Sequence, residues 1–347
     1  MKSFLLFFLI ILESSFGEEN VGVGFNEANR TSLGVIIYKV GSDKSELVNL
    51  MRSICLLEEF FNRGKNYPLL IFYDQLNQKE KLLLSSLSNS KMEFFHTPKL
   101  LPEGVEEWQV EEWASVQSEK GKRRHFGVKY RSMLQWRIFN IWSNPLLSKY
   151  QYFWYLDTDL FLLEEMCYDP FERMKERNLT FGYLWELYEK DDTYLEGLYN
   201  LTVEYLTEFN ISTKWFQQTL LPLSKQDALV PRVTQHNEKS YYRRQRYDRG
   251  YYYGCFGVGS LSFFTSQKYL SFAEYIARSA GIHKHRWGEQ VIYRIALSIF
   301  EERERVVQIE DIHAVHLPHF SGRKLQDKEL MEIFDSKKCT FKRSDLK

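Results

Sequence analysis

Three short apolar runs separated by two helical patterns most constrain the fold of this 347-residue chain. The runs cover residues 33–40, 67–73 and 92–95, and each is rich in β-branched or aromatic residues, as buried strands are. Between them, apolar residues recur at helical spacing over 47–61, and a second helix is expected over 78–87. A chain that alternates strands with helices builds a parallel sheet covered by helices. The sequence therefore predicts an α/β fold with a mainly parallel central sheet.

The helical patterns continue through the rest of the chain, and no repeat or long linker divides it. Helices are expected at 128–142, at 268–280 with Gly281 as the C-terminal cap, and at 289–300. Residues 100–124 are polar and charged, so a long excursion is expected before the first of these helices. These features favour a single domain.

The N-terminus has the pattern of a secretory signal. A basic residue precedes an apolar run at 4–12, which is too short for a bilayer, since a spanning helix needs about 20 residues. Such a run is typical of a signal peptide, and small residues at 15 and 17 suit cleavage after Gly17. We expect a signal peptide at 1–17 and a flexible lead at 18–32, with an uncleaved signal anchor as the alternative. No later stretch reads as a membrane helix, so no stable membrane span is expected after cleavage.

Sequons and cysteines also favour the lumen of the secretory pathway. The N-x-[ST] sequons begin at Asn29, Asn178, Asn200 and Asn210. The last three lie close together, so their segment is expected at the surface. The cysteines are Cys55, Cys167, Cys255 and Cys339. In an oxidising lumen one or two disulfides are expected, and three full pairings are possible.

The charges of the chain are balanced, with 46 Lys and Arg residues against 46 Asp and Glu residues. Nucleic-acid binding normally requires a basic excess, so no nucleic-acid partner is expected. The tail at 323–347 is highly charged and is expected to be peripheral.

The run at 152–163 is the most informative strand candidate. It is apolar up to Asp157-Thr158-Asp159 and apolar again afterwards. Carboxylates at the end of a buried strand are costly unless they bind something, and ligands of open α/β sheets gather at such ends. Residues two apart on a strand point to the same side, so Asp157 and Asp159 can bind one divalent cation whose other face holds a diphosphate. The alternative is a pair of ordinary surface carboxylates.

Two later segments contain further candidate site residues. Glu289 ends His285-Arg-Trp-Gly-Glu289 at the start of an expected helix. It either stabilises the positive end of that helix or faces a sugar or an acceptor hydroxyl. His316 ends Asp311-Ile-His-Ala-Val-His316 and could supply an imidazole ligand. The case for His316 depends on the resemblance given next.

Segments in the same order along the chain match the motifs of one family, residues 168–171 letter for letter and others, such as 145–159, in part. They are residues 61–74 (FNRGKNYPLLIFYD), 130–133 (YRSM), 145–159, 168–171 (YDPF), 181–189, 286–289 (RWGE) and 311–316. The corresponding motifs are F-N-R-x-x-N-Y-x-x-x-F-L-N-D, Y-R-x-M, P-L-L-x-x-Y-x-Y-Y-W-R-V-E-P-D, Y-D-P-F, Y-G-F-x-x-x-L-Y-E, R-W-G-D and D-I-G-Y-Y-H. From residue 33 to residue 320 the chain resembles the fungal Golgi α-1,2-mannosyltransferases of glycosyltransferase family fifteen.

The resemblance implies a GT-A type fold over 33–322, a Golgi location, and retaining transfer of mannose from GDP-mannose to a glycan or glycoprotein acceptor with manganese. By position, Asp157 replaces the family's metal-binding Glu beside the donor, and His316 is the second protein ligand of the metal. Asp159 completes the carboxylate pair. Glu289 replaces an Asp near the reacting sugar, and Tyr130 matches a Tyr close to the donor.

The chain also departs from the family at three positions. The family's H-F-W-S-N-F-E-I carries a Glu that could serve as a nucleophile, and alignment on residues 261–264 places Gly257 there. Front-face substitution is then favoured over a covalent double displacement. The family's Pro in E-P-D is Thr158, and its Arg after Y-R-x-M-C is Gln135. A related transferase with another nucleotide sugar, or an inactive glycan-binding relative, are the alternatives.

The segment at 241–256 mixes tyrosine with arginine. It could line the acceptor cleft, because aromatic rings stack on sugars and arginine pairs with phosphate. It could equally be a loop that runs into a buried strand.

Overall fold

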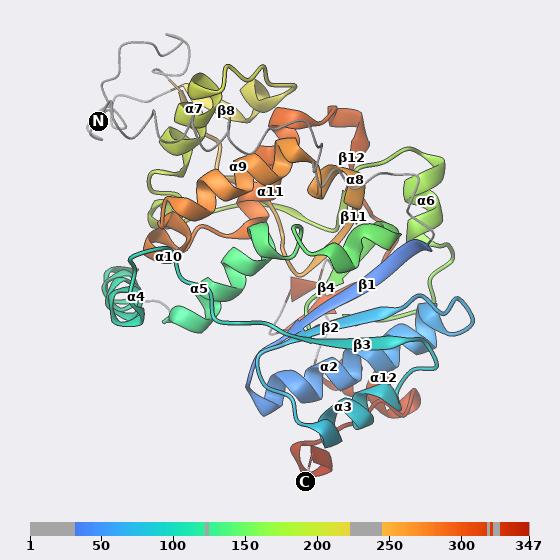
Figure 1. Ribbon diagram of the computed structural model, residues 1–347. Coiled ribbons are helices and arrows are strands. Elements are labelled where there is room, and N and C mark those ends of the chain that lie inside the picture. Colours follow the sequence, from blue (N-terminus) through green and yellow to red (C-terminus); the bar gives the residue numbers. More distant parts are fainter. Residues whose placement is uncertain (1–31, 122–124, 223–244, 318–319, 322–326, 347) are drawn as a thin grey trace, which may run out of the picture.

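The computed structural model describes residues 32–121, 125–222, 245–317, 320–321 and 327–346. A seven-stranded sheet crosses its centre in the order β12-β6-β11-β4-β1-β2-β3 (Figure 1). The strands are β1 (Ser32–Val40), β2 (Leu69–Tyr73), β3 (Met92–His96), β4 (Tyr150–Leu156), β6 (Phe181–Tyr183), β11 (Phe256–Ser260) and β12 (Val306–Gln308). Strand β11 is antiparallel to both of its neighbours, and the other pairs of this sheet are parallel. The predicted mainly parallel α/β sheet is confirmed.

Helices cover both faces of this sheet. In Figure 1, α2 (Lys44–Leu57), α3 (Gln78–Ser85) and α12 (Asp327–Ser336) lie on one side, and α5 (Val128–Gln135), α9 (Gln267–Arg278) and α11 (Glu289–Phe300) on the other. Each face has its own apolar core. The expected helices at 47–61 and 128–142 begin as α2 and α5 and continue as π-helical segments, η2 (Glu58–Asn62) and η3 (Trp136–Asn140).

Smaller elements complete the described part of the chain. Three short sheets accompany the central one. The first has the order β14 (Phe320–Ser321), β13 (Ala314–His316) and β5 (Leu160–Leu162). The second pairs β7 (Glu186–Tyr188) with β10 (Gly250–Tyr252), and the third pairs β8 (Leu220–Pro222) with β9 (Gln245–Tyr247). The other α-helices are α4 (Glu107–Gly121), α6 (Pro170–Glu176), α7 (Leu198–Glu208), α8 (Leu261–Phe264) and α10 (Gly281–His285). Short 3-10 turns are η4 (Pro145–Lys149), η5 (Asp192–Tyr194), η6 (Phe216–Thr219), η9 (Arg303–Arg305) and η10 (Arg343–Leu346).

Two local expectations are wrong. The polar stretch at 100–124 contains helix α4, which buries Val110 and Ala114 one turn apart, while Trp108 and Val116 of the same helix are exposed. Helix α9 is not capped by Gly281, because Ala280 takes the left-handed conformation with φ 61° and Gly281 opens α10. A Cβ on Gly281 would lie 2.1 Å from the ring of Trp287, so close packing explains this glycine.

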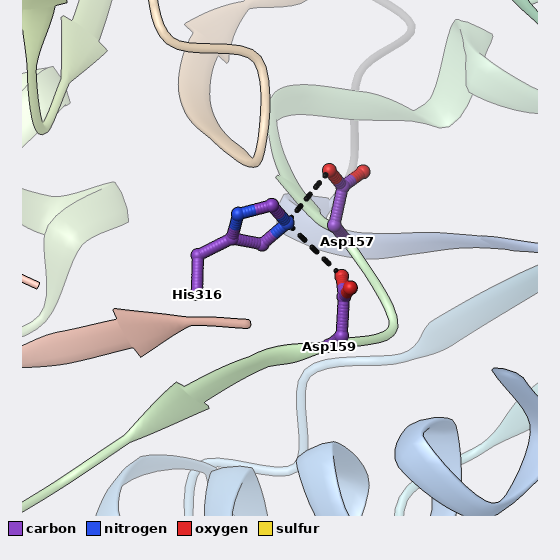
Figure 2. Close-up of side chains that lie close together, drawn as sticks. All are labelled: Asp157, Asp159 and His316. Carbon is purple, nitrogen blue, oxygen red and sulfur yellow. Dashed lines mark ion pairs between the residues drawn. The ribbon is translucent and has the colours of Figure 1, made fainter. Parts of the chain in front are cut away.

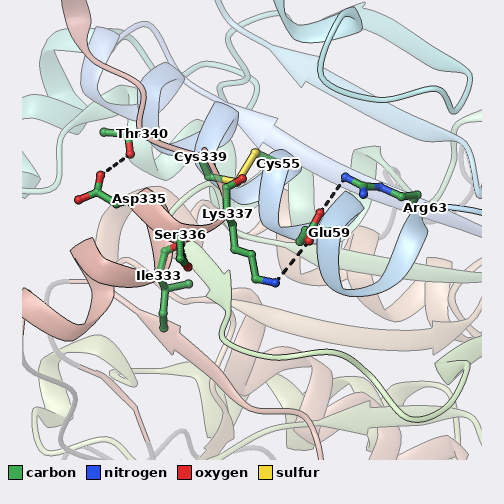
Figure 3. The surroundings of a disulfide bond; sticks show 9 residues. All are labelled: Cys55, Glu59, Arg63, Ile333, Asp335, Ser336, Lys337, Cys339 and Thr340. Carbon is green, nitrogen blue, oxygen red and sulfur yellow. Dashed lines mark hydrogen bonds and ion pairs between the residues drawn. A yellow bond between two sulfur atoms is a disulfide. The ribbon is translucent and has the colours of Figure 1, made fainter.

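The charged tail is part of the fold and not peripheral as expected. Leu330, Phe334 and Cys339 are buried, and Cys339 forms a disulfide with Cys55 of α2 (Figure 3). Lys337 adds an ion pair of 3.4 Å with Glu59. The tail was expected to be peripheral because of its many charged residues, but α12 also carries apolar residues, which pack into the core. Of the remaining cysteines, Cys167 is exposed and Cys255 is buried, and both are free thiols.

The expected signal peptide at 1–17 lies outside the described residues, as do most of the lead at 18–32 and the sequon at Asn29. The other three sequon asparagines, Asn178, Asn200 and Asn210, are exposed. Within the described ranges, no helix combines the length and the apolar character needed to span a bilayer.

Candidate metal and donor site

A tight turn, and not a continuous strand, brings Asp157 and Asp159 together. The expected strand at 152–163 is broken, because β4 ends at Leu156 and β5 begins at Leu160 in another sheet. The Leu160 N–H donates to the Asp157 carbonyl at 3.1 Å, which closes the turn, and the Asp157 N–H donates to the Cys255 carbonyl at 2.9 Å. The turn projects both carboxylates at the carboxyl end of β4, where the sequence placed them.

His316 faces both carboxylates from strand β13. Because β13 pairs antiparallel with β5, His316 lies opposite Leu160, next to the turn. Its Nε2 is 3.1 Å from Oδ1 of Asp159 and 3.7 Å from Oδ2 of Asp157 (Figure 2). The three side chains each offer one ligand atom, and these atoms all lie within 4.8 Å of one another. The structure thus brings together the three predicted metal ligands.

A second residue orients the imidazole. The hydroxyl of Tyr253 lies 2.9 Å from Nδ1 of His316, so Nε2 is left to face the aspartates. Metal-binding histidines commonly have such a partner on the other ring nitrogen. Two carboxylates and one imidazole form a ligand set that suits manganese. The chemistry of these residues therefore fits a divalent metal ion.

The pKa values reflect the crowding of charge in this group. Burial raises the pKa of Asp157 to about 6, although Arg137 and His316 oppose the rise. Burial lowers the pKa of His316, but the hydrogen bond to Asp159 and the negative charges of both aspartates outweigh this effect and raise it overall. Two carboxylates held this close repel each other, and a divalent cation removes that repulsion.

Glu289 is connected to the metal ligands through an arginine. It is the first residue of α11, as expected, and is only 4% exposed. The guanidinium of Arg137 lies 3.0 Å from Oε1 of Glu289 and 3.4 Å from Oδ1 of Asp157. Arg137 was not predicted from the sequence, although a charged residue between the apolar Trp136 and Ile138 was a usable signal.

Tyr130 borders the same site from helix α5. Burial raises the pKa of Tyr130, Arg286 opposes the rise, and the charges of Glu289 and Asp157 add to it. The guanidinium carbon of Arg286 lies 5.4 Å from the centre of the Tyr130 ring and 4.0 Å from that of Tyr194. Arg286, with its left-handed backbone at φ 62°, was named from the sequence only as part of the motif at 286–289, without a role of its own.

Gly257 lies in the interior of β11, opposite Tyr155 of β4. A Cβ there would lie 3.1 Å from two ring atoms of Phe181, so the position faces a buried ring. Residue 257 therefore carries no carboxylate, the group that the family motif leads one to expect there, and a side chain at this position would meet the Phe181 ring.

The segment at 241–256 is described from residue 245 onward, where it forms β9, β10 and the start of β11. A hollow of about 400 Å³ opens beside β9 and β10. It is lined by Tyr188, Glu189, Lys190, Leu221, Arg246, Asp248 and Arg249. Tyr253, which follows β10, contacts His316, so one segment connects this hollow with the metal ligands.

Relatives of this chain are fungal mannosyltransferases. "Probable mannosyltransferase KTR3" of Saccharomyces cerevisiae is 26% identical over 294 residues, which cover 82% of this chain and 67% of the relative. "O-glycoside alpha-1,2-mannosyltransferase homolog 2" of Schizosaccharomyces pombe is 25% identical over 287 residues, which cover 79% of this chain and 70% of the relative.

Two solved structures share the fold. Core-mannan synthase A from Aspergillus fumigatus, in its Mn/GDP form, has a TM-score of 0.69 at 21% identity and covers 86% of this chain and 82% of its own. The mannosyltransferase Ktr4p of Saccharomyces cerevisiae, in complex with GDP, has a TM-score of 0.68 at 20% identity. The match covers 88% of this chain and 76% of the Ktr4p chain. The expected GT-A type fold is confirmed.

The family model for glycolipid 2-alpha-mannosyltransferases matches residues 19–345, nearly the whole chain. The chain belongs to the glycolipid 2-alpha-mannosyltransferase family.

Proposed function

We propose that this protein is a retaining α-1,2-mannosyltransferase that moves mannose from GDP-mannose to a glycan of a glycoprotein. The observation that carries the proposal is the convergence of Asp157, Asp159 and His316 on one point at the carboxyl end of β4. Sequence relatives named as α-1,2-mannosyltransferases and neighbours solved with GDP support the choice of donor. The expected working place is the lumen of the secretory pathway, in the Golgi, with the chain anchored by its signal or secreted as alternatives.

Asp157, Asp159 and His316 would hold Mn²⁺, and Tyr253 would keep the imidazole in the ligating orientation. A bound divalent ion supplies charge that neutralises the leaving diphosphate. Tyr130 and Asp157 border the donor, and Glu289 faces the transferred sugar or the acceptor hydroxyl. The hollow beside β9 and β10 is the proposed acceptor position. Its tyrosine ring can stack on a sugar ring, and its arginine side chains can donate hydrogen bonds to sugar hydroxyls.

Gly257 favours a front-face route. The acceptor oxygen attacks C1 on the face from which the diphosphate leaves, so the C1–O bond to phosphate breaks while the C1–O bond to the acceptor forms. The acceptor proton passes to a phosphate oxygen of the leaving group. The route retains configuration without a protein nucleophile at residue 257.

Gly257 also supports a second candidate function, a catalytically inactive relative that binds glycans. Donor screening separates the candidates. Purified protein is incubated with Mn²⁺, a mannoside acceptor and either GDP-mannose or other nucleotide sugars. Transfer from GDP-mannose is the expected result. Asp159→Asn, which removes the charge of one metal ligand, should lose this transfer. Asp335→Asn, which makes the same change at an exposed carboxylate of α12, is the matched control and should keep it. Transfer from another donor alone would identify a related transferase, and glycan binding without any transfer would favour the inactive relative.

A further inference from the structure

One buried guanidinium connects the parts of this site. Arg137 on η3 is almost fully buried, and its guanidinium carbon lies 3.8 Å from the centre of the Tyr155 ring. It contacts Glu289 Oε1 at 3.0 Å and Asp157 Oδ1 at 3.4 Å, and its NH2 donates to the Gly254 carbonyl. Through this side chain, the start of α11 and the turn after β4 are held at fixed positions relative to each other.

The burial of Glu289 depends on this contact. A buried carboxylate without a cation is strongly destabilised, and a paired one is held in one orientation. The two nitrogens of the planar guanidinium bond different partners, so the arginine also fixes a direction, which an ammonium group would not. Glu289 is therefore an ion-paired carboxylate whose position is set by Arg137.

Gly254 supplies the space in which that carboxylate lies. A Cβ on Gly254 would be 2.1 Å from Oε1 of Glu289, a distance that requires one of the two groups to move. Among the described glycines, those with positive φ are Gly64, Gly104 and Gly197. Gly254 is not one of them, so space and not backbone conformation requires glycine here.

We propose that Arg137 and Gly254 are positioning residues of the transfer reaction: Arg137 holds the Glu289 carboxylate beside Asp157, and Gly254 provides the clearance for it. The inference rests on the proposed function, because it gives the geometry of Glu289 a role in catalysis. An ion-paired carboxylate orients the hydroxyls of the bound sugars and does not attack C1.

A double-mutant cycle between Gly254 and Glu289 tests the clearance. Gly254→Ala should lower kcat by about tenfold or more, because a displacement of about 1 Å can cost a hundredfold in rate. The KM for GDP-mannose should change by less than about threefold, since the metal ligands stay in place. Adding Glu289→Asp, which shortens the side chain, should make the double variant more active than Gly254→Ala alone.

Gly288→Ala is the matched control. Its Cβ would lie 3.4 Å from the nearest atom, in Gln290, which is an ordinary contact. It adds the same methyl group beside the same helix start, and its kcat should stay within about threefold of the wild-type value. If Gly254→Ala keeps the wild-type kcat, or if Glu289→Asp brings no rescue, the clearance role is wrong.

Arg137 is tested with Arg137→Lys and Arg137→Met. The lysine keeps the charge but lacks the planar group whose two nitrogens reach Glu289 and the Gly254 carbonyl in fixed directions, so kcat should fall about tenfold or more. Arg137→Met, which also removes the charge, should lower kcat further. Calorimetry of GDP with Mn²⁺ should show nearly wild-type affinity for Arg137→Lys. An Arg137→Lys variant with wild-type kcat would overturn the positioning role.

The two proposals can fail separately. If the wild-type protein transfers no sugar from any donor, the proposed function fails. The contact of Gly254 with the Glu289 carboxylate is then tested by the thermal unfolding of the same variants. The loss of Tm caused by Gly254→Ala should be smaller on the Glu289→Asp background. If the two losses of Tm simply add, the two positions are not energetically coupled, and the clearance role of Gly254 is wrong whatever the reaction.

Discussion

Nε2 of His316 lies 3.1 Å from Oδ1 of Asp159, and Leu317 extends this contact by donating its N–H to the Asp159 carbonyl at 3.1 Å. The turn after β4 and the end of β13 are thus joined through both side chain and backbone. A metal ion bound here would connect two segments that are distant in the sequence.

The first prediction concerns metal dependence. A nucleotide diphosphate is repelled by the two carboxylates, so a chelator should abolish transfer and Mn²⁺ should restore it. Asp159→Asn is nearly isosteric and should fold, yet lose about 3 kcal/mol of transition-state stabilisation, which is about a hundredfold in rate. Initial rates and circular dichroism check both expectations. Activity that persists in chelator would show that the metal assignment is wrong.

The second prediction concerns the partner of His316. Tyr253→Phe removes the hydroxyl that lies 2.9 Å from Nδ1, so Mn²⁺ affinity should fall by about 10- to 100-fold while the fold is kept. His316→Ala should weaken metal binding more than it weakens folding. Titration calorimetry with Mn²⁺ measures the affinity, and Tyr188→Phe, an exposed tyrosine, is the control. Equal affinities for Tyr253→Phe and the wild-type protein would exclude this orienting role.

The third prediction concerns the reaction route. Gly257 faces the ring of Phe181 and offers no nucleophile, so no glycosyl-enzyme intermediate should form on this segment. Intact and peptide mass spectrometry after trapping with a slow donor analogue tests this. A sugar adduct on Glu289 or another carboxylate would refute the front-face route.

The fourth prediction concerns the tail. The disulfide between Cys55 and Cys339 closes a sequence separation of 284 residues, so replacing both cysteines with serine should cost about 2–4 kcal/mol of unfolding free energy. Denaturant unfolding measures the change. Cys167→Ser, at an exposed free thiol, should leave stability unchanged. If reductant has no effect on wild-type unfolding, the disulfide does not hold the tail.

The fifth prediction concerns processing. The apolar run at 4–12 and the small residues after it predict a mature N-terminus near Glu18. Glycans are expected on some of the four sequons, and Asn178, Asn200 and Asn210 are exposed and accessible. Intact-mass analysis of protein from the secretory pathway checks both. An unglycosylated chain that retains Met1 would contradict a lumenal protein with a cleaved signal.

The sequence by itself determined the elements whose pattern is local. The strand at 33–40 and the helix at 289–300 follow from β-branched runs and apolar spacing, and both appear within a residue of their expected bounds. The position of Asp157 and Asp159 at the carboxyl end of a strand was also readable, because they interrupt an apolar run, but the turn that separates β4 from β5 was not. These signals depend on neighbours in the chain, so no knowledge of the fold was needed.

Only the tertiary structure decided which distant residues meet. The pairing of Cys55 with Cys339 was one of several possibilities, and the burial of α12 could not be read from a charged tail. Nothing in the sequence gave Arg137 a partner, and only folding placed Glu289, Asp157 and the Gly254 carbonyl around it. Such contacts depend on strand order and helix packing, which involve interactions between segments far apart in the chain, and a local pattern carries no record of them.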